Sequence, residues 1–207
     1  MMTAKSLLLV HGAGSGPWAF DGWADSFAEI EVAVPDLQEG LNVSQASMSD
    51  YTDRVVAEGR FLTKPLALCG WSMGGLVAMM AVSKLNPEAL ILIEASPPGE
   101  VQGFNEHVEP TPGVFVYPGD FRSRPESQYA RDERKRGISV PVLPDRTLVI
   151  SGRDYSNERG RQLAAYYGVR LCEFPALRHW ELSCASSVKN EVRQFLGLTV
   201  RNWPESA

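Results

Sequence analysis

A serine lies on what the sequence predicts to be a very tight turn between a strand and a helix, and this stretch constrains the fold most. The apolar run at residues 66–69 is typical of a strand covered on both faces. It leads into the pattern Gly70-x-Ser72-x-Gly74, and a helix is expected to continue over residues 76–85. Small residues at these positions allow the close backbone approach that a nucleophile elbow requires. A glycine-rich turn capped by serine is the alternative, and partners elsewhere in the chain must decide between the two.

Strands and helices are predicted to alternate along the rest of the chain. Further strands are expected at residues 6–10, 30–34, 89–94, 146–151 and 169–174, and helices at 47–61, 125–136, 158–167 and 186–196. This alternation predicts an α/β fold with a mainly parallel sheet. A length of 207 residues favours a single domain, residues 1–207, with a sizeable core.

Residues 96–145 differ from the rest of the chain. Prolines are frequent, apolar periodicity is poor, and charges gather at residues 131–136. This segment is predicted to be an insertion between two core strands. A charge run of this kind is most often a solvated helix face, but its place after a sheet strand also allows it to act as a short cap over an active site.

Composition excludes several classes of partner. The net charge of −5 argues against nucleic acid or an anionic membrane as the main partner. The longest apolar runs are far shorter than a membrane helix requires. The three cysteines, at positions 69, 172 and 184, form no C-x-x-C pair, which fits a reducing compartment. We therefore expect a cytoplasmic protein.

Cofactor and metal sites are not indicated by the sequence. The glycine-rich loop at residues 12–16 is followed by Pro17, where a dinucleotide fingerprint has its third glycine. The histidines His11, His107 and His179 do not have the spacing of zinc ligands. We expect no cofactor and no metal.

Polar residues that suit nucleophilic catalysis follow the ends of several predicted strands. Reacting groups of an open parallel sheet collect at the carboxyl ends of its strands. The order Ser72, Asp154, His179 is the order expected for a serine, its carboxylate and its histidine in this architecture. The histidine takes the serine proton, and the carboxylate fixes the histidine tautomer. Glu94, at the end of the preceding core strand, is the rival carboxylate.

The His11-Gly12 pair is interpreted as the start of an oxyanion loop. In this interpretation the amides of Ala13 and Met73 face the reacting carbonyl oxygen, and His11 is structural. The candidates for lining the substrate site are Trp18, Trp71 and Trp180.

These motifs resemble the α/β-hydrolase superfamily, specifically its small intracellular esterase-like members. The resemblance rests on residues 8–14, 70–75, 152–154 and 178–180, and covers most of the chain except residues 96–145. It implies a triad of Ser72, Asp154 and His179. The antiparallel strand pair that usually precedes the first of these motifs is absent, so about six strands are expected, with a short cap.

The function expected from the residues and the resemblance is hydrolysis of a small carboxylic ester through an acyl-enzyme intermediate. A thioesterase acting on CoA- or carrier-bound acyl groups is the alternative, since the chemistry is the same. A non-catalytic binding module on a hydrolase scaffold is the third. The expected partner is thus a small-molecule ester or thioester.

Overall fold

A six-stranded parallel sheet organises the computed structural model, which describes residues 3–117 and 123–200. The strands are β1 (Ser6–Val10), β2 (Glu31–Ala33), β3 (Leu66–Trp71), β4 (Ala89–Ile93), β7 (Thr147–Ser151) and β8 (Arg170–Glu173). Their order is β2-β1-β3-β4-β7-β8, and every neighbouring pair is parallel. The α/β class and the strand number predicted from the sequence are confirmed.

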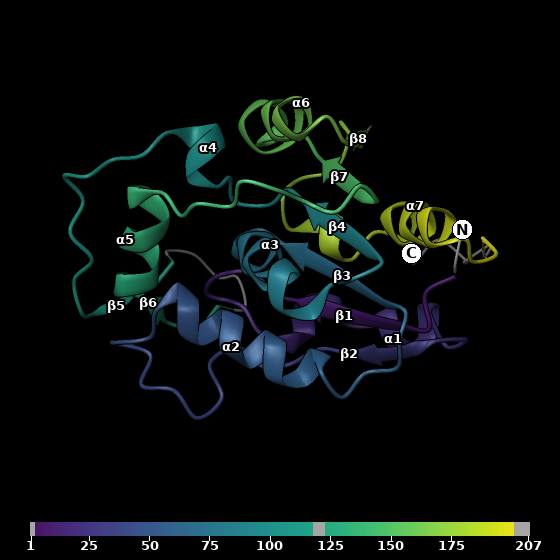
Figure 1. Cartoon of the computed structure of the whole chain (residues 1–207), viewed down its shortest axis with the longest axis horizontal. Coiled ribbons are helices and arrows are strands. Elements are labelled where there is room, and N and C mark those ends of the chain that lie inside the picture. The colour runs from purple at the N-terminus through teal and green to yellow at the C-terminus, as the bar shows by residue number, and fades with distance from the viewer. Residues whose placement is uncertain (1–2, 118–122, 201–207) are drawn as a thin grey trace.

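Helices connect the strands and cover both faces of the sheet (Figure 1). The longer helices are α2 (Met48–Gly59), α3 (Met73–Leu85) and α7 (Ser186–Leu196). The shorter ones are η1 (Pro17–Phe20), α1 (Trp23–Ser26), the π-helical turn η2 (Ser156–Arg161), α6 (Gln162–Tyr167) and η3 (Glu181–Ser183). Helix α2 begins after Ser47 because the Ser47 hydroxyl and the Asp50 carboxylate cap each other's backbone amides.

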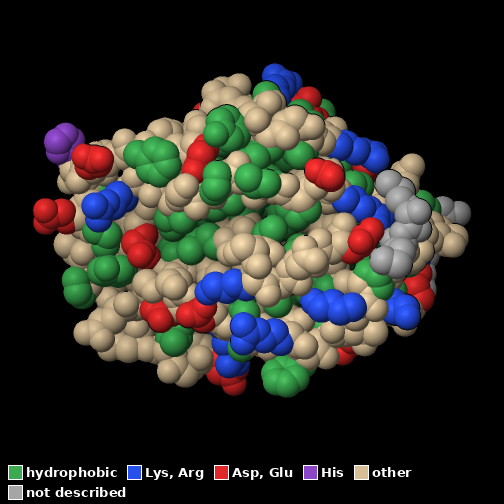
Figure 2. Space-filling view, in the orientation of Figure 1, with side chains coloured by type: hydrophobic (Ala, Val, Ile, Leu, Met, Phe, Trp, Pro, Cys, Tyr) green, Lys and Arg blue, Asp and Glu red, His purple; other side chains and the backbone are tan. Residues whose placement is uncertain are grey.

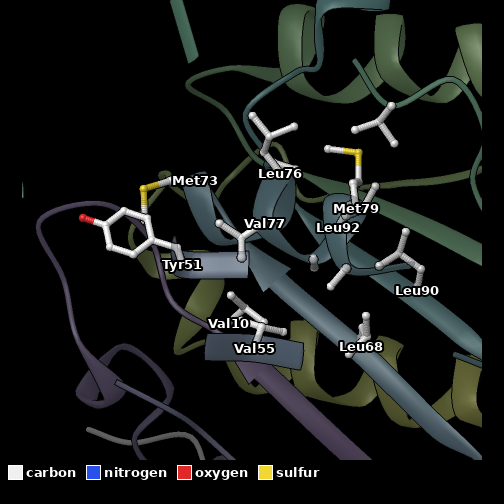
Figure 3. Close-up of a cluster of buried hydrophobic side chains, with 14 of the residues drawn as sticks. Val10, Tyr51, Val55, Leu68, Met73, Leu76, Val77, Met79, Leu90 and Leu92 are labelled. Atoms are coloured by element: carbon white, nitrogen blue, oxygen red, sulfur yellow. The ribbon is translucent and has the colours of Figure 1, made fainter. Parts of the chain in front are cut away.

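The core consists of two hydrophobic clusters, one on each face of the sheet. Strand residues alternate between them: Leu8 and Val10 pack with α2 and α3, while Leu7 and Leu9 pack with α1 and α7. Figure 3 shows the first cluster, in which Val55 of α2 and Leu76 of α3 pack with strand residues. Because both faces are covered, the central strands are apolar throughout, which is the pattern that the sequence shows.

The predicted insertion at residues 96–145 contains little regular structure. Its elements are α4 (Gly99–Gln102), the two-residue strands β5 (Val114–Phe115) and β6 (Glu126–Ser127), and α5 (Gln128–Arg136). They lie together at one end of the sheet, away from the chain termini (Figure 1). Residues 118–122 of the insertion lie outside the described part of the chain.

Arg124 ties the insertion to the sheet. Its guanidinium donates to both Asp36 carboxylate oxygens, at 2.8 Å for the Nη1 to Oδ2 pair, and its Nε donates to the Ser15 carbonyl oxygen at 2.6 Å. Asp36 follows β2 and Ser15 follows β1, so one side chain joins the insertion to two strand ends.

This ion pair predicts a loss of stability in acid. The Arg124 guanidinium, with a smaller contribution from His11, holds the pKa of Asp36 well below its usual range. A carboxyl group whose pKa is lower when folded contributes stability above its unfolded pKa, about 3.9, and this contribution is lost as the pH falls below that value. We expect Asp36→Asn to lower the free energy of unfolding at pH 7 and to flatten its decrease below about pH 4.

Denaturant unfolding at a series of pH values measures this effect. The matched control is the exposed Asp21→Asn, which is expected to follow the wild-type curve. A curve for Asp36→Asn that runs parallel to the wild type through the acid range would contradict the prediction.

Charges of both signs are spread over the face shown in Figure 2, with apolar side chains between them. Among residues 3–117 and 123–200, no helix combines the length and the apolar character needed to cross a membrane.

Candidate active site

Ser72 lies on the predicted tight turn, between the end of β3 and the start of α3. Its backbone has φ 57° and ψ −124°, a conformation that residues other than glycine rarely adopt. Three backbone hydrogen bonds hold it there: the Ser72 amide donates to Ile93 O at 3.0 Å, and the Ser72 carbonyl accepts from Gly75 at 3.0 Å and from Ser96 at 2.8 Å. The turn is therefore fixed by β4 and by the first turn of α3.

The glycines of this turn are required by close backbone approach. A Cβ on Gly70 would lie 2.3 Å from the Gly74 carbonyl oxygen, and one on Gly74 would lie 2.1 Å from that of Val10. Both distances are far below van der Waals contact, so no larger residue fits without moving the backbone. This crowding is the physical reason for the pattern seen in the sequence, and α3 begins at Met73, directly after the turn, where a helix was expected.

His179 lies beside the same cavity as Ser72, and its imidazole contacts Glu94. The Nδ1 atom is 2.5 Å from Glu94 Oε2, and the second oxygen, Oε1, accepts from the Gly152 amide at 2.8 Å. The Glu94 side chain is fully buried, whereas that of His179 is 20% exposed. An ionised carboxylate only accepts hydrogen bonds, so Nδ1 carries the proton and Nε2 is left as the basic nitrogen.

Asp154 does not contact the His179 imidazole, although the order of the residues in the sequence predicted that contact. Its carboxylate accepts from the backbone amide of His179 at 2.9 Å and from Arg153 Nε at 3.5 Å, and the side chain is 34% exposed. The His179 amide is the main cause that holds the pKa of Asp154 below its ordinary value. Asp154 thus contacts the backbone of His179, and the rival residue, Glu94, contacts the ring.

Local backbone geometry explains this difference. Glu94 directly follows β4 and has a φ of 42°, whereas Asp154 lies past the end of β7 at the exposed rim. Gly152 makes room for the glutamate, since a Cβ there would lie 2.5 Å from Leu177 O and 3.3 Å from Glu94 Oε1. The carboxylate can therefore reach the Gly152 amide and the imidazole together.

Two aromatic residues hold the imidazole in place. The Trp71 indole donates from Nε1 to the His179 carbonyl oxygen at 3.0 Å, with the two ring centroids 5.1 Å apart. The Tyr155 ring meets the imidazole edge to face at 5.2 Å. Three groups on different strand ends, Glu94, Trp71 and Tyr155, therefore fix the position of one ring.

The predicted oxyanion residues both border Ser72. Met73 follows it at the start of α3, and the loop that carries Ala13 passes close to it, since a Cβ on Gly12 would lie 3.1 Å from that of Ser72. His11 is buried, and its Nε2 accepts from the Leu37 amide at 3.1 Å. This bond occupies the ring nitrogen that a base would need, which agrees with the structural role expected for His11.

A cavity of about 620 Å³ opens onto Ser72 and His179. Ala13, Trp71 and Trp180 line it, as expected for two of the three candidate tryptophans. Trp18 is not among the described residues that line this cavity. Its ring packs against Gly16, and the ring centroid lies 5.3 Å from the guanidinium of Arg124, a residue of the insertion.

Four further residues line the cavity: Tyr117, Arg134, Tyr155 and Arg159. Arg159 Nη1 donates to Ser72 Oγ at 3.4 Å, a long hydrogen bond. Only the position of η2 after the end of β7 points to Arg159, because nothing in the sequence distinguishes it from the other arginines. Within the described residues there is no group of three or more metal-ligating side chains.

Comparison with known proteins gives one family and many solved structures. The sequence model of the alpha/beta hydrolase family matches residues 7–205, which is nearly the whole chain. No curated protein matches the chain in sequence.

Three solved structures illustrate the similarity of fold. The type II thioesterase from the borrelidin biosynthetic cluster has a TM-score of 0.70 at 15% identity, over 97% of this chain and 94% of that chain. A methylesterase from Arabidopsis has a TM-score of 0.69 at 16% identity, over 93% and 98% of the two chains. A pyrethroid hydrolase from Sphingobium faniae has a TM-score of 0.69 at 19% identity, over 94% and 98%. Likeness at this level of identity shows a shared fold.

Proposed function

The chain belongs to the alpha/beta hydrolase family, and from that premise we propose that it is a serine hydrolase that cleaves a small carboxylic ester. Ser72 is the nucleophile, His179 is the general base and acid, and Glu94 is the carboxylate that orients the imidazole. The observation that carries the proposal is the buried Glu94 carboxylate, 2.5 Å from His179 Nδ1, behind a cavity that also exposes Ser72.

The reaction follows from these positions. His179 Nε2 takes the Ser72 proton as Oγ attacks the ester carbonyl, and it then gives that proton to the leaving alcohol. The amides of Ala13 and Met73 stabilise the oxyanion of the tetrahedral intermediate. Water, activated by the same histidine, then releases the acid from the acyl-enzyme. Asp154 acts on this machinery only through the backbone of His179.

A fluorophosphonate probe tests the nucleophile directly, because it reacts covalently with activated serines. We expect one equivalent of label, located on the peptide that contains Ser72, and no label after Ser72→Ala. The matched control is Ser83→Ala, an exposed serine on α3, which should label like the wild type. An unlabelled wild-type protein, or equal labelling of Ser72→Ala, would end the proposal.

Thioester hydrolysis is the second candidate, supported by a basic chamber of about 310 Å³ next to the catalytic cavity. Arg131 and Lys135 of α5 line this chamber, where they can attract the phosphates of a carrier arm. Comparison of kcat/KM for p-nitrophenyl esters of increasing chain length and for the matching acyl-CoA thioesters separates the two substrate classes.

A further inference from the structure

Arg159 brings a positive charge to the nucleophile of the proposed reaction. It lies on η2, and its Nη1 atom is 3.4 Å from Ser72 Oγ. The guanidinium also lies over the Tyr155 ring, 4.2 Å from the ring centroid. Burial is the main cause that lowers the pKa of Arg159 from its ordinary value, so the charge is partly removed from water. The proposed triad does not use this residue.

The other cations that line the cavity or the chamber beside it already have acidic partners. Arg134 pairs with Glu126 at 3.0 Å, and the Glu126 side chain is 2% exposed. Arg131 contacts the same carboxylate at 3.0 Å, and Lys135 pairs with Asp132 at 2.9 Å. These pairs balance much of the charge on α5.

Arg159 differs in this respect. Among residues 3–117 and 123–200 it forms no ion pair with a carboxylate. Glu94 is the acid that acts on it electrostatically, but both Glu94 oxygens are already bonded, one to Gly152 and one to His179. A half-buried guanidinium without its own carboxylate is costly unless something else supplies the negative charge.

Two adjoining spaces meet at Arg159, and their charged lining residues are cationic. Tyr117, Arg134, Tyr155 and Arg159 line both the cavity at Ser72 and the chamber of about 310 Å³ beside it. Neither space has an aspartate or a glutamate among its described lining residues. A ligand that extends from Ser72 into the chamber thus passes the Arg159 guanidinium and meets no opposing carboxylate.

We propose that the substrate carries an anionic group, a carboxylate or a phosphate, that binds to Arg159 while its ester or thioester carbonyl lies at Ser72. This inference rests on the proposed hydrolase function and specifies its substrate class. The planar guanidinium fits either oxyanion through two parallel hydrogen bonds. Arg159 is then a specificity residue, and the triad remains the catalytic machinery.

Two pairs of substrates test the proposal and distinguish the two anions. The first pair is p-nitrophenyl hemiglutarate and p-nitrophenyl pentanoate, which differ in a terminal carboxylate. The second is p-nitrophenyl 4-phosphonobutanoate and the same pentanoate, which differ in a terminal phosphonate that stands in for a phosphate. In one of the pairs we expect kcat/KM to be higher for the anionic member by about 10- to 100-fold, the range of a charged hydrogen bond.

The variants isolate the guanidinium. Arg159→Gln is expected to bring the ratio of kcat/KM for the anionic substrate to kcat/KM for the neutral one close to unity. Arg159→Lys is expected to keep part of the wild-type preference. Arg161→Gln is the matched control: Arg161 lies two positions along η2, is exposed, and pairs with Glu173 at 3.0 Å. We expect it to keep the wild-type ratio.

The outcomes separate this inference from the proposed function. Hydrolysis that depends on Ser72 but shows no anionic preference in either pair, or a preference unchanged in Arg159→Gln, overturns the inference and leaves the hydrolase intact. If no ester or thioester is hydrolysed, calorimetry decides, with glutarate and 4-phosphonobutanoate titrated into Ser72→Ala. Binding of either ligand that Arg159→Gln weakens at least tenfold supports the inference, and no binding, or binding unaffected by that change, rejects it.

Discussion

Ser72→Ala is expected to lower kcat for ester hydrolysis by about a million-fold, the loss typical of removing the nucleophile of such a triad. Without Oγ, no acyl-enzyme can form, and only the oxyanion amides and substrate binding remain. The folded state should change little, because alanine keeps the Cβ atom and therefore keeps the strain at φ 57°. Steady-state kinetics with p-nitrophenyl esters, together with a thermal unfolding curve, measures both effects.

Ser72→Gly separates catalysis from backbone strain. Glycine adopts φ 57° without steric cost, so this variant should be equally inactive but about 1 kcal/mol more stable than Ser72→Ala. Activity of either variant above about 1% of wild type would show that another group attacks the substrate. Equal stability of the two variants would show that the turn is not strained.

The sheet could be predicted from the sequence because its physical requirements are local. Strands covered on both faces must be apolar throughout, as at residues 66–69, and the backbone contact of Gly70 with Gly74 leaves no choice of residue. The order of serine and histidine then follows from the topology. These features need only the identity of neighbouring residues, which the sequence contains.

The carboxylate partner could not be predicted in this way. Glu94 and Asp154 follow adjacent strands, and both are acids of the correct kind at the correct edge of the sheet. The backbone decides between them: the positive φ of Glu94 and the small size of Gly152 bring one carboxylate to the imidazole. Neither property can be read from an alternation of apolar residues.

The two strands of the insertion could not be predicted, for a different reason. Its strands β5 and β6 have two residues each, too few to show any periodicity. The charge run of α5 was expected to be a solvated face, but Arg131 and Arg134 bind the buried Glu126. Arg159 reaches Ser72 from a π-helical turn within a segment predicted to be an ordinary helix, and that local change of geometry has no clear signature in composition.

Glu94→Gln is expected to lower kcat by about 10,000-fold, because it favours the wrong histidine tautomer. The Gly152 amide donates to the side-chain oxygen at position 94, so the glutamine must keep its oxygen there and turn its NH2 group toward His179 Nδ1. Nδ1 then accepts and Nε2 carries the proton, which leaves no base to take the Ser72 proton. The same kinetic assay, with a thermal unfolding curve to confirm that the variant is folded, measures the loss.

Asp154→Asn is the matched comparison, since it makes the same carboxylate-to-amide change at the other acid beside His179. An asparagine oxygen can still accept the His179 backbone amide that Asp154 binds at 2.9 Å. The imidazole ring and its tautomer are untouched, so activity should stay within about tenfold of wild type, the scale of a single lost or weakened hydrogen bond. A large loss in Asp154→Asn together with a small one in Glu94→Gln would reverse the assignment, because it would mean that Asp154 turns onto the ring when substrate binds.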